Sequence, residues 1–177
     1  MLLAVCLAAF AAGCGGGGGS TSDSEKAADN ETLNDLLARE LTVVQAYGAS
    51  LALARGQTRA LALQLRGQDQ AHVDALTKAI RGVGGEIEAE PLPLEEERPA
   101  NEAEALTLAY EEEDDALAQV LGEAPRLQTY GPRELAAALA ASHAQHLVVL
   151  RQALGAGPLA AVPGAFEPGD EPPPEGR

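Results

Sequence analysis

Apolar side chains recur every three or four residues in four stretches of this chain, the period that places them on one face of an α-helix. The stretches cover residues 30–54, 59–83, 102–121 and 132–154. Residues that interrupt or begin helices separate them: Arg55-Gly56-Gln57-Thr58, Gly84-Gly85, a capping box at Asn101-Glu102-Ala103-Glu104, and Pro132. The sequence therefore predicts an all-α protein with four amphipathic helices.

The lengths of the connections favour one topology. The first and last connections are short, so each joins an antiparallel pair of helices. The middle connection, residues 86–100, contains three Pro and six Glu and has no helical period. Fully extended it spans about 50 Å, whereas a helix of about 25 residues is about 38 Å long. We therefore expect a four-helix bundle with one long crossover between helices two and three, which is the ferritin-like arrangement.

Six polar side chains lie on the otherwise apolar stripes, and they include all three histidines of the chain. They are Glu40, Asp69, His72, Glu113, His143 and His146. Two pairs within this set are three residues apart, so each pair shares a helix face and can reach one ion. A bundle interior does not hold isolated charges, so these groups must pair, lose their charge or bind an ion. Three carboxylates and three imidazoles can supply a complete metal coordination shell.

The two predicted hairpins resemble each other and place these groups at one depth. A shift of 74 residues superimposes Asp69 on His143 and His72 on His146, and a shift of 73 superimposes Glu40 on Glu113. Glu40 lies 16 residues before Gly56, and His72 lies 16 residues after it. An antiparallel pair therefore sets Glu40 and His72 at about the same level.

The stretch 31–155 resembles the bacterial ferritin-like, rubrerythrin-related bundle proteins, and among them small exported members of unknown function. The resemblance is carried by Glu40 with Tyr47, by Asp69-Gln70-Ala71-His72, and by His143-Ala144-Gln145-His146. In that family helices one and three each give a Glu, and helices two and four each give a Glu-x-x-His. The resemblance implies that Glu40 and Glu113 are terminal metal ligands and that His72 and His146 are imidazole ligands.

Two positions depart from the family pattern, at the residues that bridge two metals in that family. Asp69 is one methylene shorter than Glu, and His143 replaces a carboxylate by an imidazole. The third nitrogen shifts the metal preference toward Zn, Cu or Ni and away from iron. We expect one or two ions, with Fe, Zn and Mn as candidates, and no catalytic residue is assigned. A metal-free interaction scaffold is the alternative, and a di-iron oxidase or peroxidase is the least favoured interpretation.

Two of the six residues have other interpretations. Glu113 lies in a run of five acids, which covers more than one helical turn, so one acid must face inward in any case and Glu112 is an alternative. Asp69 could instead lie at an exposed edge, paired with Arg66 or Lys78. Tyr47 is most simply a core residue with a hydrogen-bonded hydroxyl.

The formal net charge of −15 argues against nucleic acid as a partner and against anionic lipid head groups bound through protein charge. The two cysteines, Cys6 and Cys14, precede the helices, so neither a disulfide framework nor a cysteine metal site is expected within them.

The N-terminal residues have the features of an export signal. Residues 1–13 are mostly apolar, end in small residues and are too short to span a bilayer. Phe10-Ala11-Ala12-Gly13-Cys14 resembles a bacterial lipobox, in which the Cys is diacylated. We expect a lipid anchor at Cys14 on the outer face of the cytoplasmic membrane, with plain secretion as the alternative. Ala11 stands where Leu is usual, and no Lys or Arg precedes the apolar run, so a translation start upstream of Met1 is one interpretation.

The expected domain organisation follows from these patterns. Residues 1–13 form a signal peptide, 14–29 a flexible Gly/Ser tether, 30–157 the bundle, and 158–177 a disordered Pro-rich acidic tail. An anchor and two tails do not suit a closed ferritin cage, whereas they are compatible with a homodimer. The sequence identifies no protein partner.

Overall fold

The computed structural model describes residues 22–94 and 99–157. Within these residues the chain forms α1 (Asp23–Leu51), α2 (Gly56–Gly82), α3 (Glu102–Glu123), the short 3-10 helix η1 (Ala124–Arg126) and α4 (Tyr130–Ala153). The predicted all-α class with four long helices is confirmed. The predicted signal peptide, the lipidation site Cys14 and the tail 158–177 lie outside the described residues. In the part of the chain that the structure describes, no helix is long and apolar enough to cross a membrane.

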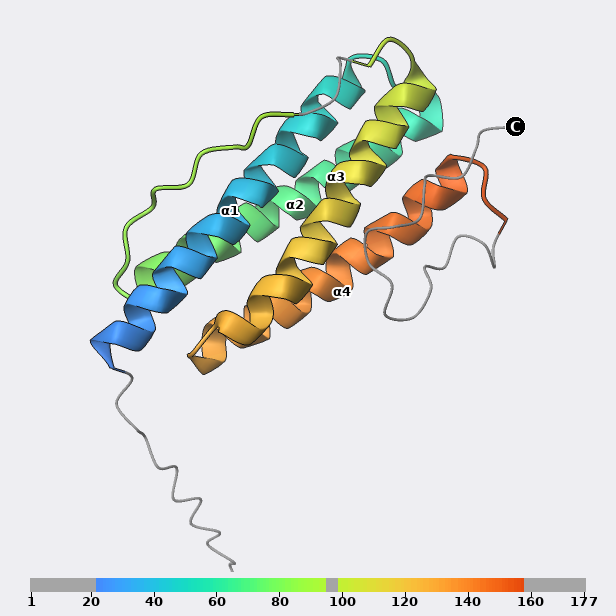
Figure 1. The fold of residues 1–177 in the computed structure, drawn as a ribbon. Helices are drawn as coiled ribbons and strands as arrows, with labels where there is room; N and C mark the ends of the chain where they lie inside the picture. Colours follow the sequence, from blue (N-terminus) through green and yellow to red (C-terminus); the bar gives the residue numbers. More distant parts are fainter. Residues whose placement is uncertain (1–21, 95–98, 158–177) are drawn as a thin grey trace, which may run out of the picture.

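The four long helices form one bundle (Figure 1). Helix α1 packs against α2 and α3, and α4 packs against α3 and α2. The connection after α2 runs back along the outer side of α1, so that α3 starts at the end of the bundle where α2 starts (Figure 1). The predicted long crossover between the second and third helices is therefore confirmed.

Two side chains of α1 hold this crossover in place. Asn34 donates from Nδ2 to the Glu86 carbonyl at 3.0 Å and accepts at Oδ1 from the Glu88 and Ala89 amides at 2.8 and 3.1 Å. About two helical turns further along α1, the Thr42 hydroxyl accepts from the Leu92 amide at 2.8 Å. An extended segment has no internal hydrogen bonds, so these side chains satisfy backbone groups that would otherwise need water.

Helix α1 begins at Asp23, and the predicted boundary at residue 30 is therefore wrong. Ser22 and Glu25 form a capping box, which starts the helix inside the segment predicted as tether. The buried carboxylate of Asp29 accepts hydrogen bonds from the Gln128 and Thr129 amides at 2.6 and 3.0 Å. Because Thr129 precedes α4 and makes no cap of its own, Asp29 caps a helix of the other hairpin. Residues 23–29 thus belong to the bundle.

The helices end close to the predicted positions. Gly84 and Gly155 follow α2 and α4 with φ angles of 79° and 99°, a conformation in which Gly avoids the cost of a side chain. The Gly85 amide donates back to the Ile80 carbonyl at 2.9 Å, as in a Schellman motif. At the start of α3, Asn101 accepts at 3.0 Å from the Glu104 amide, which confirms that predicted cap.

The core consists of two apolar clusters, one toward each end of the bundle. One includes Val43, Tyr47, Leu65, Tyr110, Leu147 and Leu150. The other includes Leu33, Leu37, Leu76, Ile80, Leu127 and Leu139. Each fully buried side chain of this kind contributes roughly 1.5–3 kcal/mol to the free energy of unfolding. The apolar faces differ slightly from the predicted stripes. On α1, Val43 is buried and Val44, expected on the apolar stripe, is only half-buried; on α4, Ala153, also expected on its stripe, is exposed.

Candidate metal centre

The structure brings all six predicted polar residues together at mid-height of the bundle. Helix α1 supplies Glu40, α2 supplies Asp69 and His72, α3 supplies Glu113, and α4 supplies His143 and His146. Five of them are at most 3% exposed, and the side chain of His72 is 15% exposed. A polar layer therefore separates the two apolar clusters.

His143 lies at the centre of this layer, with a carboxylate on each side of its ring. Its Nδ1 is 2.7 Å from Glu113 Oε2, and its Nε2 is 2.8 Å from Glu40 Oε1. The imidazole thus joins the acids of α1 and α3, which belong to different hairpins. Both ring nitrogens are engaged by groups that are themselves candidate ligands.

His146 is held from two sides. Its Nδ1 lies 2.9 Å from Glu113 Oε1 and 3.4 Å from Asp69 Oδ1. Its Nε2 lies 2.7 Å from Oε1 of Gln68, a residue on the exposed side of α2. An amide oxygen can only accept, so this contact places a ring proton on Nε2. The carboxylates that face Nδ1 also only accept, so without a metal the ring carries a proton on both nitrogens, and Nδ1 is the nitrogen that an ion would take.

His72 completes the layer from α2. Its Nδ1 is 3.4 Å from Glu40 Oε2 and 3.3 Å from Asp69 Oδ1. Neither contact has hydrogen-bond geometry, because His72 Nδ1, Glu40 Oε2 and both oxygens of Asp69 are buried without a hydrogen-bond partner. Buried polar atoms are normally paired, so these four atoms mark a place where a further group is expected.

Two residues beyond the predicted set support the layer. The Tyr47 hydroxyl donates to Glu113 Oε1 at 2.7 Å, so this tyrosine orients a carboxylate as well as filling the core. Gln68 was missed by sequence reasoning, and no signal marks it, because it lies on the polar side of the α2 stripe.

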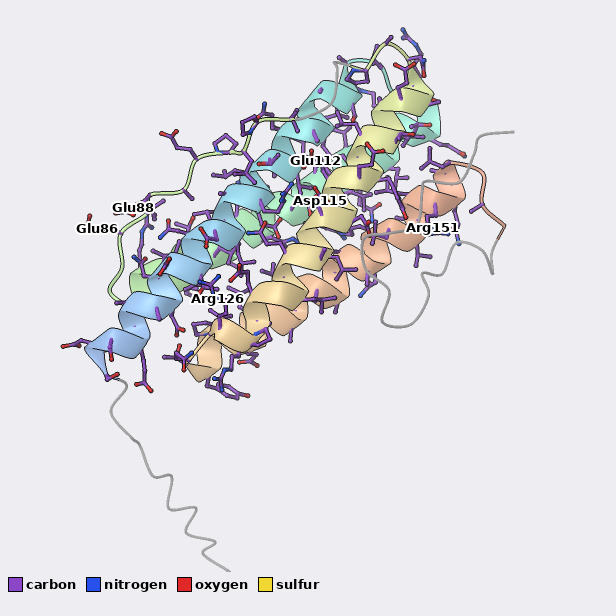
Figure 2. The ribbon with its side chains drawn as sticks, viewed as in Figure 1. Glu86, Glu88, Glu112, Asp115, Arg126 and Arg151 are labelled. Carbon is purple, nitrogen blue, oxygen red and sulfur yellow. The ribbon has the colours of Figure 1, made fainter. Side chains whose placement is uncertain are left out.

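The structure decides both alternative interpretations of the acids. Glu113 points into the polar layer and is fully buried. Glu112 instead pairs with Arg39 of α1, whose Nη1 lies 3.1 Å from Glu112 Oε2 and 3.3 Å from Asp115 Oδ2. Figure 2 shows Glu112 and Asp115 on the side of α3 that faces α1. The exposed-edge interpretation of Asp69 is wrong, since this side chain is fully buried and contacts His72 and His146.

The charges of the layer stabilise one another. Burial alone would lower the pKa of His143, but its hydrogen bonds to Glu113 and Glu40 and their charges outweigh burial and raise the pKa to about 10. Burial would also lower the pKa values of His72 and His146, but their close contacts with carboxylates, Asp69 and Glu40 for His72 and Asp69 and Glu113 for His146, raise both to about 9. Burial alone would raise the pKa values of Glu40 and Glu113, yet the facing histidines hold both below the usual value. Without a metal, three imidazolium groups thus compensate three carboxylates.

The donor atoms also fit transition-metal ions. Two groups each have one ligand atom per residue, all within 4.8 Å of one another: Asp69, Glu113, His143 and His146, and Glu40, His72 and His143. Nitrogen and carboxylate oxygen are the usual ligands of Zn²⁺, and bonds of about 2.0 Å in a tetrahedral site place ligand atoms about 3.3 Å apart. Within these groups, the 3.4 Å contacts between His72 and Glu40 and between His146 and Asp69 already have this spacing. The shorter contacts would open by about 0.5 Å around an ion.

Comparisons with known proteins agree with the helical arrangement. Residues 25–156 match the family model described as a ferritin-like domain. A crystal structure of a conserved hypothetical protein from Mycobacterium tuberculosis is similar, with a TM-score of 0.65 and 23% identity, over 72% of this chain and 98% of that chain. A crystal structure of ferritin-like, diiron-carboxylate proteins from Bacillus anthracis str. Ames has a TM-score of 0.62 and 21% identity, over 74% and 98%. No curated protein matches the chain.

The family match covers most of the chain, and the two solved structures share its helical arrangement. The expected ferritin-like bundle is therefore confirmed. This chain belongs to the ferritin-like domain family.

Proposed function

We propose that this protein binds one or two transition-metal ions at the centre of its ferritin-like bundle, and that it is anchored on the outer face of the cytoplasmic membrane. The observation that carries the proposal is Asp69, a carboxylate that is fully buried and whose two oxygens have no hydrogen-bond partner. A buried charge is costly unless it is paired and hydrogen-bonded or coordinates a metal. The two histidines near Asp69 lie 3.3 and 3.4 Å from its Oδ1 and supply charge without hydrogen bonds, so a bound cation would satisfy this carboxylate better. Three further ligand side chains, Glu113, His143 and His146, lie around it, so an ion can complete its coordination there.

The donor set favours Zn²⁺ over a di-iron centre. Three nitrogens and three carboxylates face one another, whereas iron and manganese sites are richer in oxygen. The Bacillus anthracis structure is described as a diiron-carboxylate protein, which keeps Fe and Mn as candidates for this chain. An oxidase or peroxidase reaction is the least favoured role, because Asp69 and His143 stand where two bridging Glu residues are expected.

Metal content of the full chain tests the proposal. The protein would be purified without a His-tag or chelator, incubated with Zn²⁺, Fe²⁺ or Mn²⁺, desalted and analysed for bound metal. We expect about one or two equivalents per chain, and less than about one tenth of an equivalent for every metal would overturn the proposal. His146→Ala should lose metal, while Gln145→Ala, at the exposed neighbouring position, should retain it.

A metal-free scaffold is the competing function, and one observation favours it. His143 already bridges Glu113 and Glu40 at 2.7 and 2.8 Å, so part of the layer is satisfied without an ion. In that case added metal leaves the melting temperature unchanged. A metal-dependent rise in melting temperature that is lost in His72→Ala and His146→Ala would exclude the scaffold role.

The envelope location is a separate part of the proposal and depends on Cys14. Diacylation of this Cys, after removal of residues 1–13, would tether the bundle to the membrane surface. The full chain expressed in a bacterium should enter the membrane fraction with a lipid mass on its N-terminal peptide. Cys14→Ser should move it to the soluble exported fraction, and a wild-type chain that is exported without lipid would support plain secretion instead.

A further inference from the structure

We propose that His143 bridges two metal ions as an imidazolate, with Nδ1 bound to one ion and Nε2 to the other. The inference rests on the proposed metal binding and concerns how two ions share the site. In the family pattern this position holds a bridging Glu, so the bridge would be kept while its chemistry changes. The geometry around the ring carries the argument.

Each ring nitrogen of His143 faces a carboxylate of a different ligand group. Nδ1 faces Glu113, which groups with Asp69 and His146. Nε2 faces Glu40, which groups with His72. His143 is the one residue common to both groups, and its two nitrogens point in opposite directions. A carboxylate bridge would place two ions about 3.5–4 Å apart. An imidazolate bridge places them roughly 6 Å apart, from two bonds of about 2 Å and the width of the ring.

The rest of the layer suits two ions. A histidine that binds one metal usually donates its other N–H to an acceptor outside the coordination shell. His146 has that arrangement, because its Nε2 contacts Gln68. His143 does not, because both of its nitrogens contact carboxylates that are themselves candidate ligands.

The charge of the layer also balances for two divalent ions. Glu40, Asp69 and Glu113 supply three negative charges, and an imidazolate at His143 supplies a fourth. When the first ion binds, His143 and His146 each release one proton to solvent, and when the second ion binds, His72 releases one and His143 releases its remaining ring proton. Two M²⁺ ions thus replace four protons, and the four negative charges match the two ions. In a buried site without net charge, the attraction between opposite charges offsets the desolvation cost that each charge carries.

The two positions differ in a way that predicts their order of filling. The group around Nδ1 has four ligands, all buried, which is the closed arrangement of structural zinc sites. The group around Nε2 has three protein ligands and includes His72, whose side chain is 15% exposed, so it leaves one coordination position unfilled by protein. We therefore expect the four-ligand position to fill first and the three-ligand position to exchange ions faster.

Copper(II) titration of the full chain, followed by electron paramagnetic resonance and metal analysis, tests the bridge. The first equivalent should give the spectrum of an isolated Cu²⁺ ion. The second should reduce the signal per copper, because an imidazolate bridge couples the two spins antiferromagnetically. Zn²⁺ added before one equivalent of Cu²⁺ should fill the closed position and restore the full, uncoupled copper signal.

Two variants separate the bridge from metal binding in general. His143→Gln should bind copper without spin coupling, and His72→Ala should bind one uncoupled ion. If His143→Gln does not fold, the wild-type titration and His72→Ala still decide the question. Two uncoupled ions, a single ion in wild type, or coupling that persists in His143→Gln would overturn the bridge while leaving the proposed metal binding intact. Failure of wild type to bind any metal would instead overturn the proposed function.

Discussion

Removing one oxygen atom from Tyr47 tests how the polar layer is held together. The Tyr47 hydroxyl donates a 2.7 Å hydrogen bond to Glu113 Oε1, and both side chains are buried. Tyr47→Phe removes this donor and leaves the ring, so the packing of the surrounding cluster is preserved. The loss therefore measures the hydrogen bond rather than a cavity.

The expected cost follows from the charge of the acceptor. A hydrogen bond to a charged group contributes about 1.5–3 kcal/mol to the free energy of unfolding. Glu113 keeps His143 and His146 as partners at 2.7 and 2.9 Å, so it is not left unpaired. We expect a loss of about 2 kcal/mol, which lowers the melting temperature of a domain of this size by roughly 6–10 °C.

Thermal unfolding followed by circular dichroism, with EDTA present at pH 7, measures this loss. Tyr130→Phe is the matched control, because Tyr130 is 80% exposed and its substitution should change stability by less than about 0.5 kcal/mol. In the metal-loaded protein, Tyr47→Phe should also weaken metal binding by about tenfold, as loss of a hydrogen bond to a ligand does. Equal melting of Tyr47→Phe and wild type would refute the hydrogen bond to an ionised Glu113.

Three further predictions concern stability. In metal-free protein, the raised histidine pKa values contribute stability that is complete below pH 6.5 and is lost as pH rises through about 9 to 10. The lowered pKa values of Glu40 and Glu113 contribute stability that is lost as pH falls below about 4.5. Urea unfolding with EDTA across this pH range should give a maximum in the free energy of unfolding between about pH 4.5 and pH 6.5. A free energy of unfolding that stays constant up to about pH 11 would contradict the prediction. Asn34→Ala should release the crossover from α1 and lower the free energy of unfolding by about 1–3 kcal/mol. A Glu-specific protease should then cleave after Glu86 and Glu88, which lie beside α1 in Figure 2, faster than in wild type. Asp29→Ala should cost about 2–3 kcal/mol in urea unfolding, whereas Asp35→Ala, at an exposed position of α1, should cost little; equal effects would mean that Asp29 does not cap α4.

The periodic parts of the sequence were enough to predict the architecture. Four stripes, two short connections and one long one leave few ways to bury the apolar faces, and the bundle has the predicted crossover. The co-location of the six polar residues was also predictable, because each lies on an apolar stripe at matching depth. Their role as metal ligands stays a prediction.

Two features could not be read from the sequence. The start of α1 was misplaced because Asp29 has the character of a polar linker residue until its long-range partners, Gln128 and Thr129, are known. The choice of Glu113 among five acids depended on Arg39, which draws Glu112 and Asp115 to another face. These contacts join residues about 70 to 100 positions apart, where local patterns carry no information.

The division of the six polar residues between the hairpins has a consequence for how the halves of the chain recognise each other. With protonated histidines, the hairpin α1–α2 brings two carboxylates and one imidazolium, and the hairpin α3–α4 brings one carboxylate and two imidazolium groups. Two copies of the first hairpin would bury a net charge of about −2, and two copies of the second about +2, whereas one of each buries none. The hairpins resemble each other, so two like hairpins from different chains could pair; the difference in buried net charge disfavours such mispairing and exchange of hairpins between chains. The charges of the polar layer thus favour pairing of the two different hairpins over pairing of two like hairpins, even without a bound metal ion.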